Sequence, residues 1–159
     1  MSESLSHVGP GGDARMVDVS AKPATARVAR AAGSIRMTAK ALAAIRDNAV
    51  TKGDVLTVAK VAGVMAAKRT AELVPLCHPL PLSDVQVLLA IDESVPAIHA
   101  EATVRTTAST GVEMEAITAV AMTLITVYDM AKSIDKGMVI TDIRLLEKSG
   151  GRSGAWTRG

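Results

Sequence analysis

The chain has 159 residues, enough for one domain with a hydrophobic core, and 48% hydrophobic with 21% charged residues is typical of a globular protein. It contains no Phe, one Trp and one Tyr, so its core must be built from aliphatic side chains and Met, and a sheet that stacks RNA bases on aromatic rings is disfavoured. The net charge of +2 is too small for a general nucleic-acid-binding protein.

Cysteine use and hydropathy predict the compartment. The single cysteine, Cys77, excludes an internal disulfide and suits a reducing cytosol. The sequence shows neither a signal-peptide pattern nor a membrane span. We therefore expect a cytoplasmic protein with no membrane partner.

The first third of the chain predicts one strand and one short helix. Residues 1–14 are rich in Gly, Ser and Pro, and we expect a flexible segment there, before a domain that covers residues 15–148. Residues 15–20 alternate and suggest a short extended piece. Residues 25–37 fit a helix by their Ala content and a strand by their alternation; we take the strand, with Gly33 at a bulge. Thr38 then caps a helix that runs through Ile45.

The middle of the chain predicts a helix, a rigid loop and a hairpin. Asp54 follows a turn and can cap a helix that runs to about Thr70. Residues 75–81 contain three prolines and cannot form regular structure. Alternating apolar residues then predict strands at 85–91 and 98–104, joined by a turn that contains Pro96.

Residues 110–136 predict one long helix, followed by a last strand at 138–146. Thr110 and Glu113 form a capping-box pattern, and Gly137 stands where a helix is normally stopped. The helix is apolar on most faces and too short for a bilayer, so we expect a sheet on one side and another subunit on the other. The Gly-rich residues 149–159 predict a flexible tail.

In order, these elements are strand, helix, strand, strand, helix, strand. This is the order of the split βαβ, or ferredoxin-like, α+β fold, in which helices cover one face of an antiparallel sheet. In a chain this apolar, a neighbouring subunit is the natural cover for the other face.

The long helix carries charges at both ends. Asp129 and Lys132 form an i,i+3 pair at its C-terminal end. Burial of Lys132 there would lower its pKa toward neutral, as an acid–base catalyst requires. The alternative is that Glu113, Glu115 and Lys132 only complement the helix dipole.

Two further segments carry candidate binding residues. His78 lies between prolines, which preset its orientation, so it is either an acid, base or phosphate ligand or a structural histidine bonded to backbone. Cys77 beside it lacks the signs of a nucleophile and is interpreted as packing. Residues 148–154 combine glycines with a Lys and an Arg and could wrap an anion; a disordered tail is the alternative.

Helix geometry separates the two charged ends. Glu113 and Asp129 are sixteen residues apart, which is about 24 Å along a helix. They cannot both contact one small substrate from the same chain. If they share a site, an antiparallel helix of a second copy must bring its other end across a two-fold axis.

Six blocks of sequence carry a resemblance to a known family. The blocks are ARMVDVS, KGDVL, AAKRTAELVPLCHPL, TGVEMEAITAV, YDMAKSIDKGMVI and LLEKSGGRSG. In this order they resemble the molybdenum cofactor biosynthesis protein C family of cyclic pyranopterin monophosphate synthases, from about Arg15 to Gly154. The resemblance implies a lyase that converts (8S)-3′,8-cyclo-7,8-dihydroguanosine 5′-triphosphate, supplied by an upstream radical cyclase, to cyclic pyranopterin monophosphate and diphosphate. It also implies a homohexamer, a trimer of dimers with sites at the dimer interface.

The matched motifs imply the site residues. Asp129, Lys132 and Lys52 match the catalytic positions. The expected substrate-binding positions are Leu76, Cys77, His78, Glu113, Met114, Glu115, Lys68, Arg27 and Lys148. We expect no metal site and no cofactor, with magnesium accompanying the triphosphate as the open alternative.

Two other functions remain open from the sequence alone. A non-catalytic nucleotide- or pterin-binding regulatory module would use the same fold, because fold does not determine function. A structural oligomer without a ligand would leave the anion-suited residues unexplained.

Overall fold

The computed structural model describes residue 8 and residues 11–159, so most of the expected flexible segment at 1–14 lies outside the described residues. The elements of the described part, in chain order, are β1 (Thr25–Arg36), α1 (Ala39–Arg46), α2 (Val55–Lys68), α3 (Thr70–Leu73), β2 (Leu82–Asp92), β3 (Ala97–Ala108), α4 (Glu113–Ala131), β4 (Val139–Ser149) and β5 (Trp156–Thr157).

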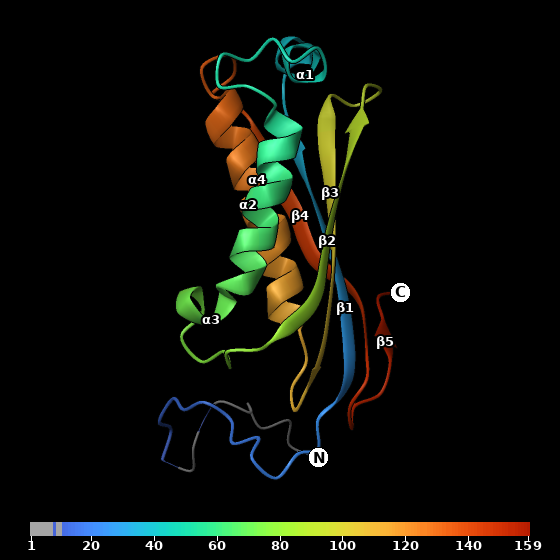
Figure 1. Cartoon of the computed structure of the whole chain (residues 1–159). Helices are drawn as coiled ribbons and strands as arrows, with labels where there is room; N and C mark the ends of the chain where they lie inside the picture. Colours follow the sequence, from blue (N-terminus) through green and yellow to red (C-terminus); the bar gives the residue numbers. More distant parts are fainter. Residues whose placement is uncertain (1–7, 9–10) are drawn as a thin grey trace.

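The strands form one antiparallel sheet in the order β2-β3-β1-β4-β5. Helices α2 and α4 lie together on one face of this sheet, as Figure 1 shows. The first four strands and the two long helices have the split βαβ order, so the expected α+β, ferredoxin-like fold is confirmed.

β1 is the central strand, and its ambiguous sequence does form a strand with the expected bulge. The pairing of β1 with β4 shifts register between Ala32 and Ser34, which places Gly33 at the irregularity. A Cβ atom at Gly33 would lie 2.9 Å from Cγ1 of Val120 and 3.0 Å from Cδ1 of Leu124. The missing side chain therefore lets α4 lie close to the middle of the sheet.

Both predicted caps of the first two helices are present. Thr38 accepts a hydrogen bond from the backbone N–H of Ala41, at 3.3 Å, and so begins α1. Asp54 accepts one from the N–H of Thr57, at 3.0 Å, and begins α2. These side chains satisfy backbone donors that have no partner inside the helix.

The expected ends of the long helix are wrong. α4 begins at Glu113 with Val112 as its N-cap and without a side-chain cap, so the capping box of Thr110 does not form. The carboxylate of Glu113 does not reach back to Thr110; it is folded over Gly111 and lies 3.4 Å from Lys148. The helix ends at Ala131, and Gly137 lies in a separate turn six residues later, so it does not terminate the helix.

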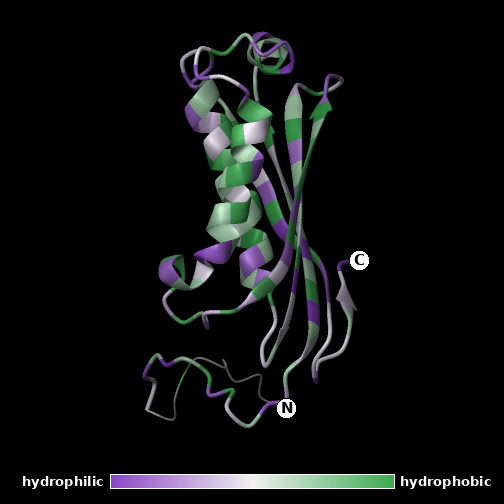
Figure 2. Cartoon of the chain, viewed as in Figure 1, coloured by the Kyte–Doolittle hydropathy of each residue, from purple (hydrophilic) through white to green (hydrophobic). Residues whose placement is uncertain are grey.

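α4 is covered on two sides within this chain, by the sheet and by α2, whereas the sequence suggested another subunit for the second side. Its length and composition alone would allow it to cross a membrane, contrary to our expectation, but 50% of its most apolar window is buried inside the structure. It is the central core helix, among aliphatic side chains and Met as the composition predicted. Figure 2 shows this pattern, with hydrophobic residues along both long helices and alternation along the strands.

The two ends of the described chain depart from the predicted elements. Residues 15–20 form no strand; among the described residues before β1 the only β-bridge joins Val8 and Ala14. The tail was expected to be flexible and without regular structure, but it contains β5, which pairs with β4 through Trp156 and Lys148. This pairing folds the Gly-rich segment back against the sheet.

Candidate functional site

The last turn of α4 presents Asp129 to two lysines. Nζ of Lys132 lies 2.6 Å from Oδ1 and Nζ of Lys52 lies 2.7 Å from Oδ2, while Lys52 also donates to the backbone carbonyl of Asp129 at 3.1 Å. Lys52 comes from the turn before α2, and it reaches Asp129 because α2 begins where α4 ends (Figure 1). The motif-matched trio is therefore brought together in one chain.

Charge pairing sets the protonation state of this cluster. Hydrogen bonds from Lys132 and then Lys52 lower the pKa of Asp129 to about 2, so its carboxylate is ionised at neutral pH. The expectation that burial lowers the pKa of Lys132 is wrong for this chain, because the side chain is 51% exposed and Asp129 raises its pKa. The cluster holds two ammonium groups on one carboxylate.

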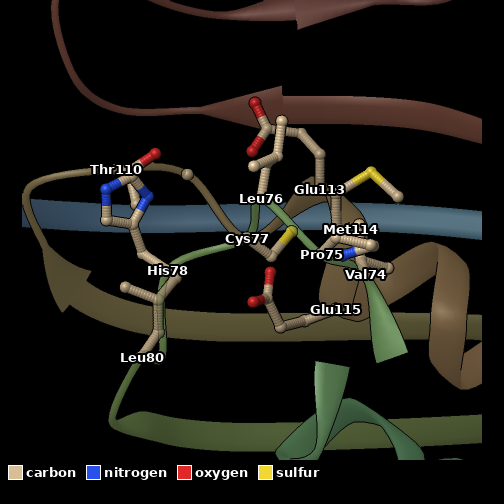
Figure 3. A pocket seen from close by; sticks show the side chains of 11 residues that line it. Val74, Pro75, Leu76, Cys77, His78, Leu80, Thr110, Glu113, Met114 and Glu115 are labelled. Atoms are coloured by element: carbon tan, nitrogen blue, oxygen red, sulfur yellow. The ribbon is translucent and has the colours of Figure 1, made fainter. Parts of the chain in front are cut away.

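At the other end of α4, the proline-fixed loop forms a first cavity of about 530 Å³ with the start of the helix. It is mainly apolar, as Figure 3 shows, and its lining residues are Val74, Pro75, Leu76, Cys77, His78, Leu80, Thr110, Gly111, Glu113, Met114 and Glu115. Six of the predicted substrate-binding residues therefore line a single cavity.

His78 is fixed by backbone, which was one of the two sequence interpretations. Its Nε2 lies 2.8 Å from the carbonyl oxygen of Val17. A carbonyl only accepts, so Nε2 carries a proton and donates it to Val17. The segment at 15–20 thus orients this histidine although it forms no strand.

Glu115 is the buried acid of the first cavity. It is 4% exposed, and burial raises its pKa to about 7, with the charge of Glu113 acting in the same direction. Its carboxyl group lies beside the sulfur of Cys77 in Figure 3, and burial, then the charge of Glu115, raises the pKa of that thiol. Cys77 is therefore a protonated thiol, consistent with its interpretation as packing.

A second cavity of about 540 Å³ lies next to the first and is lined by cations. Thr110, Gly111 and Glu113 line both cavities. The basic residues of the second cavity are Lys22, Arg27, Lys148 and Arg152. Such a cluster can bind several phosphate oxygens through charge-assisted hydrogen bonds.

The Gly-rich tail forms one wall of the second cavity. Lys148 donates to Oγ of Ser153 at 2.6 Å. Gly150 and Gly151 have φ values of +97° and +73°, and Cβ atoms there would overlap the carbonyl of Ala26 and the guanidinium of Arg27. The glycines thus let this loop close over Arg27.

Comparison with known proteins identifies the family. The model of the MoaC family matches residues 16–151. The chain belongs to the MoaC family. It is similar to two proteins named cyclic pyranopterin monophosphate synthase. The protein of Cereibacter sphaeroides (strain ATCC 17029 / ATH 2.4.9) is 55% identical over 150 residues, 94% of each chain. The protein of Thermomicrobium roseum is 55% identical over 154 residues, 97% of this chain and 93% of that one.

The residues that match the family's motifs fall into two groups at opposite ends of α4. Lys52, Asp129 and Lys132 lie at its C-terminal end. The cavity residues lie at its N-terminal end, about 24 Å away along the helix axis. In one chain of this MoaC family member the two groups do not meet, as the sixteen-residue spacing predicted.

Lys68 is the one predicted substrate-binding residue that lies outside both cavities. It is the last residue of α2 and lines a separate cavity of about 370 Å³ with Asp84 and Leu80. Leu80 also borders the first cavity, so Lys68 is a neighbour of the site rather than part of its wall.

Sequence reasoning did not select Lys22 or Thr110 as site residues, and it named Arg152 only within a segment that could wrap an anion; the structure places all three at the cavities. The signal for Arg152 was this Gly-rich segment, for which a disordered tail was the alternative interpretation. Lys22 had none, since it lies in a loop before β1 and approaches the second cavity only through the fold.

Proposed function

We propose that this protein is a cyclic pyranopterin monophosphate synthase of molybdenum cofactor biosynthesis. The observation that carries the proposal is the 55% identity to synthases so named over nearly the whole chain, with the motif-matched residues gathered in two clusters. The enzyme is then a lyase that converts (8S)-3′,8-cyclo-7,8-dihydroguanosine 5′-triphosphate to cyclic pyranopterin monophosphate and releases diphosphate. A regulatory binding module is not favoured, because both relatives are named as enzymes.

The two cavities suit the two halves of such a substrate. The first is apolar and carries His78, Glu115 and backbone groups, which suit a ring system with N–H donors and ring nitrogens. The second brings four cations to the triphosphate. In this assignment, charge that develops on the departing diphosphate is stabilised by Arg27 and Lys148.

The Asp129 cluster supplies the proton transfers. Opening the guanine ring and rebuilding a pterin fused to a pyran needs several such transfers. Lys132 and Lys52 offer N–H donors beside the reacting groups, while the ionised carboxylate of Asp129 holds both lysines in place. Magnesium would enter with the triphosphate, since the described residues include no group of three or more His, Cys, Asp or Glu side chains that could hold a metal.

The working site in this proposal lies between two copies of the chain. A two-fold axis sets one copy's α4 antiparallel to the other's, so that the partner's Asp129 end faces the cavities. Exposed apolar side chains on the helical layer, among them Val61 and Met65 of α2 and Ile125 of α4, support such a contact. The homohexamer, the cytoplasmic location and a radical cyclase upstream are part of the same proposal.

The test is turnover of the purified protein with the cyclised dihydro-GTP. Mass spectrometry should detect cyclic pyranopterin monophosphate, and diphosphate should appear in equal amount. The Asp129→Ala variant is the inactive reference. Retention of the substrate without consumption would instead support the binding module.

A further inference from the structure

Glu113 stands between the two cavities and lines both of them. Its carboxylate is folded back over Gly111, where a Cβ atom would overlap it. Oε1 lies 3.4 Å from Nζ of Lys148, and the two side chains are only 28% and 24% exposed. The carboxylate is therefore held at the boundary and turned toward the second cavity.

Glu113 is the one acidic residue among the described residues that line the second cavity. Its neighbours there are the basic residues Lys22, Arg27, Lys148 and Arg152. Lys148 donates one hydrogen bond to Ser153, and its ammonium group also pairs with the carboxylate of Glu113. A phosphate ligand requires the same ammonium group, so ligand and Glu113 compete for Lys148.

We infer that Glu113 is a specificity-determining residue: its carboxylate pairs with Lys148 and is displaced only by a ligand that carries a diphosphate group. The identity of that ligand rests on the proposed function, but the competition itself does not. A ligand without phosphate leaves Glu113 on Lys148. A ligand with diphosphate displaces it.

The displaced carboxylate can turn into the first cavity, which Glu113 also lines. There it accepts hydrogen bonds from N–H donors on the ring system of the same ligand. Phosphate binding and ring binding thereby become coupled, and by linkage the coupling is the same in either order. The site thus favours ligands that carry both halves over either half alone.

The experiment titrates inorganic diphosphate into the full-length protein by calorimetry. Glu113→Gln keeps the shape of the side chain and removes its charge, so diphosphate should bind about three- to fivefold more tightly than to the wild type, the range of a partly exposed ion pair. The matched control is Glu72→Gln, which removes an exposed acid of α3 and should leave the affinity unchanged.

A double-mutant cycle with Lys148→Gln separates competition from a general charge effect. Lys148→Gln alone should weaken diphosphate binding, and Glu113→Gln should then give little further gain. Glu113→Ala serves as the second variant if Glu113→Gln unfolds at a lower temperature than the wild type.

Equal or weaker diphosphate binding by both Glu113 variants would overturn the inference, as would a gain of the same size in the Lys148→Gln background. Turnover assays distinguish this outcome from failure of the proposed function. If Glu113→Gln binds diphosphate more tightly than the wild type but the wild type shows no turnover, only the proposed function is wrong. If the wild type shows turnover but the Glu113 variants do not bind diphosphate more tightly, only the inference is wrong.

Discussion

Gly63 of α2 lies directly against Thr123 of α4. A Cβ atom at position 63 would overlap Oγ1 of Thr123 and lie 3.0 Å from the carbonyl oxygen of Ala119. Thr123 is fully buried and donates to that same carbonyl at 2.8 Å, so moving it aside would break this hydrogen bond. This contact sets the close approach of the two helices, and the approach brings Lys52, before α2, to Asp129, at the end of α4.

The first prediction is that Gly63→Ala destabilises the protein although it raises helix propensity. Overlap with a packed neighbour costs about 1–3 kcal/mol, and the propensity gain of about 1 kcal/mol offsets only part of it. Urea unfolding should show a lower free energy of unfolding. Lys60→Arg, an exposed change on the same helix, should stay within about 0.5 kcal/mol of the wild type. A Gly63→Ala variant as stable as the wild type would mean that the helices can separate without cost.

The sequence was sufficient for most elements because their signals are local. Alternation located β2 and β3, and the oxygens of Thr38 and Asp54 marked two helix starts. The start of α4 was missed because the carboxylate of Glu113, which a capping box would use locally, lies beside Lys148, a residue far away in the chain. β5 has two residues and exists only through its pairing with β4, so no periodicity could show it.

The second prediction concerns the Asp129 cluster. Asp129→Ala removes the carboxylate that both lysines contact, and Lys132→Ala removes one ammonium group. Either change should lower turnover at least about 100-fold, the range of acid–base catalysis. Because the cluster is about half exposed, neither change should alter the elution volume in gel filtration. Glu93→Gln, at an exposed ion pair with Arg46, is the control and should keep full turnover. Near-wild-type product formation by either alanine variant would remove that residue from the mechanism.

The third prediction is a pH dependence of stability from Glu115. Burial raises the pKa of this carboxyl from 4.5 to about 7, so the folded state holds its proton over a range in which the unfolded state has lost it. The folded state binds more protons there, and stability must fall as pH rises from about 4.5 to 7. The whole effect is at most about 3 kcal/mol, at 1.36 kcal/mol per pKa unit.

Glu115→Gln isolates this contribution, because glutamine is neutral at every pH. The free energy of unfolding, measured by urea at pH 5, 6, 7 and 8, should fall less steeply in this variant than in the wild type. The variant should be the more stable of the two at pH 8. Parallel curves for the two proteins would show that Glu115 is already ionised in the folded state.

The clusters of the candidate site were only partly visible in the sequence. Asp129 and Lys132 are three residues apart on one helix, so their ion pair could be predicted from the sequence. Lys52 reaches the same carboxylate from 77 residues away, and only the antiparallel packing of α2 on α4 brings it there. The pKa of Lys132 was predicted with the wrong sign because the sequence does not report exposure.

The fourth prediction concerns the loop over Arg27. Gly151→Ala places a methyl group where the guanidinium lies and imposes a side chain at φ +73°. Either the loop or the guanidinium of Arg27 must move, and both lie at the second cavity, so diphosphate should bind at least about tenfold more weakly, equivalent to 1.4 kcal/mol. Gly154→Ala is the matched control: its φ is +65°, but a Cβ atom there would meet nothing within 4 Å. Gly154→Ala therefore has the same backbone strain but no overlap. If both variants lose a similar amount of diphosphate affinity, strain alone explains the effect.

The fifth prediction tests whether two chains share one site. Asp129→Ala disables the cluster at one end of α4, and Arg27→Ala disables the second cavity at the other end. Each variant alone should be inactive. If the cluster of one chain serves the cavities of its partner, a mixed dimer contains one site in which both halves are intact.

After equal amounts of the two variants are unfolded and refolded together, half of the dimers are mixed and half of the sites in each are intact. Turnover should therefore recover to about a quarter of the wild-type value, by random pairing across a two-fold axis. The control mixes Asp129→Ala with Lys132→Ala, which disable the same cluster, so every site of a mixed dimer keeps one defect and turnover should stay low. If mass spectrometry confirms mixed dimers but the first mixture recovers no turnover, each chain completes its own site. The proposed antiparallel arrangement of the two α4 helices would then be wrong.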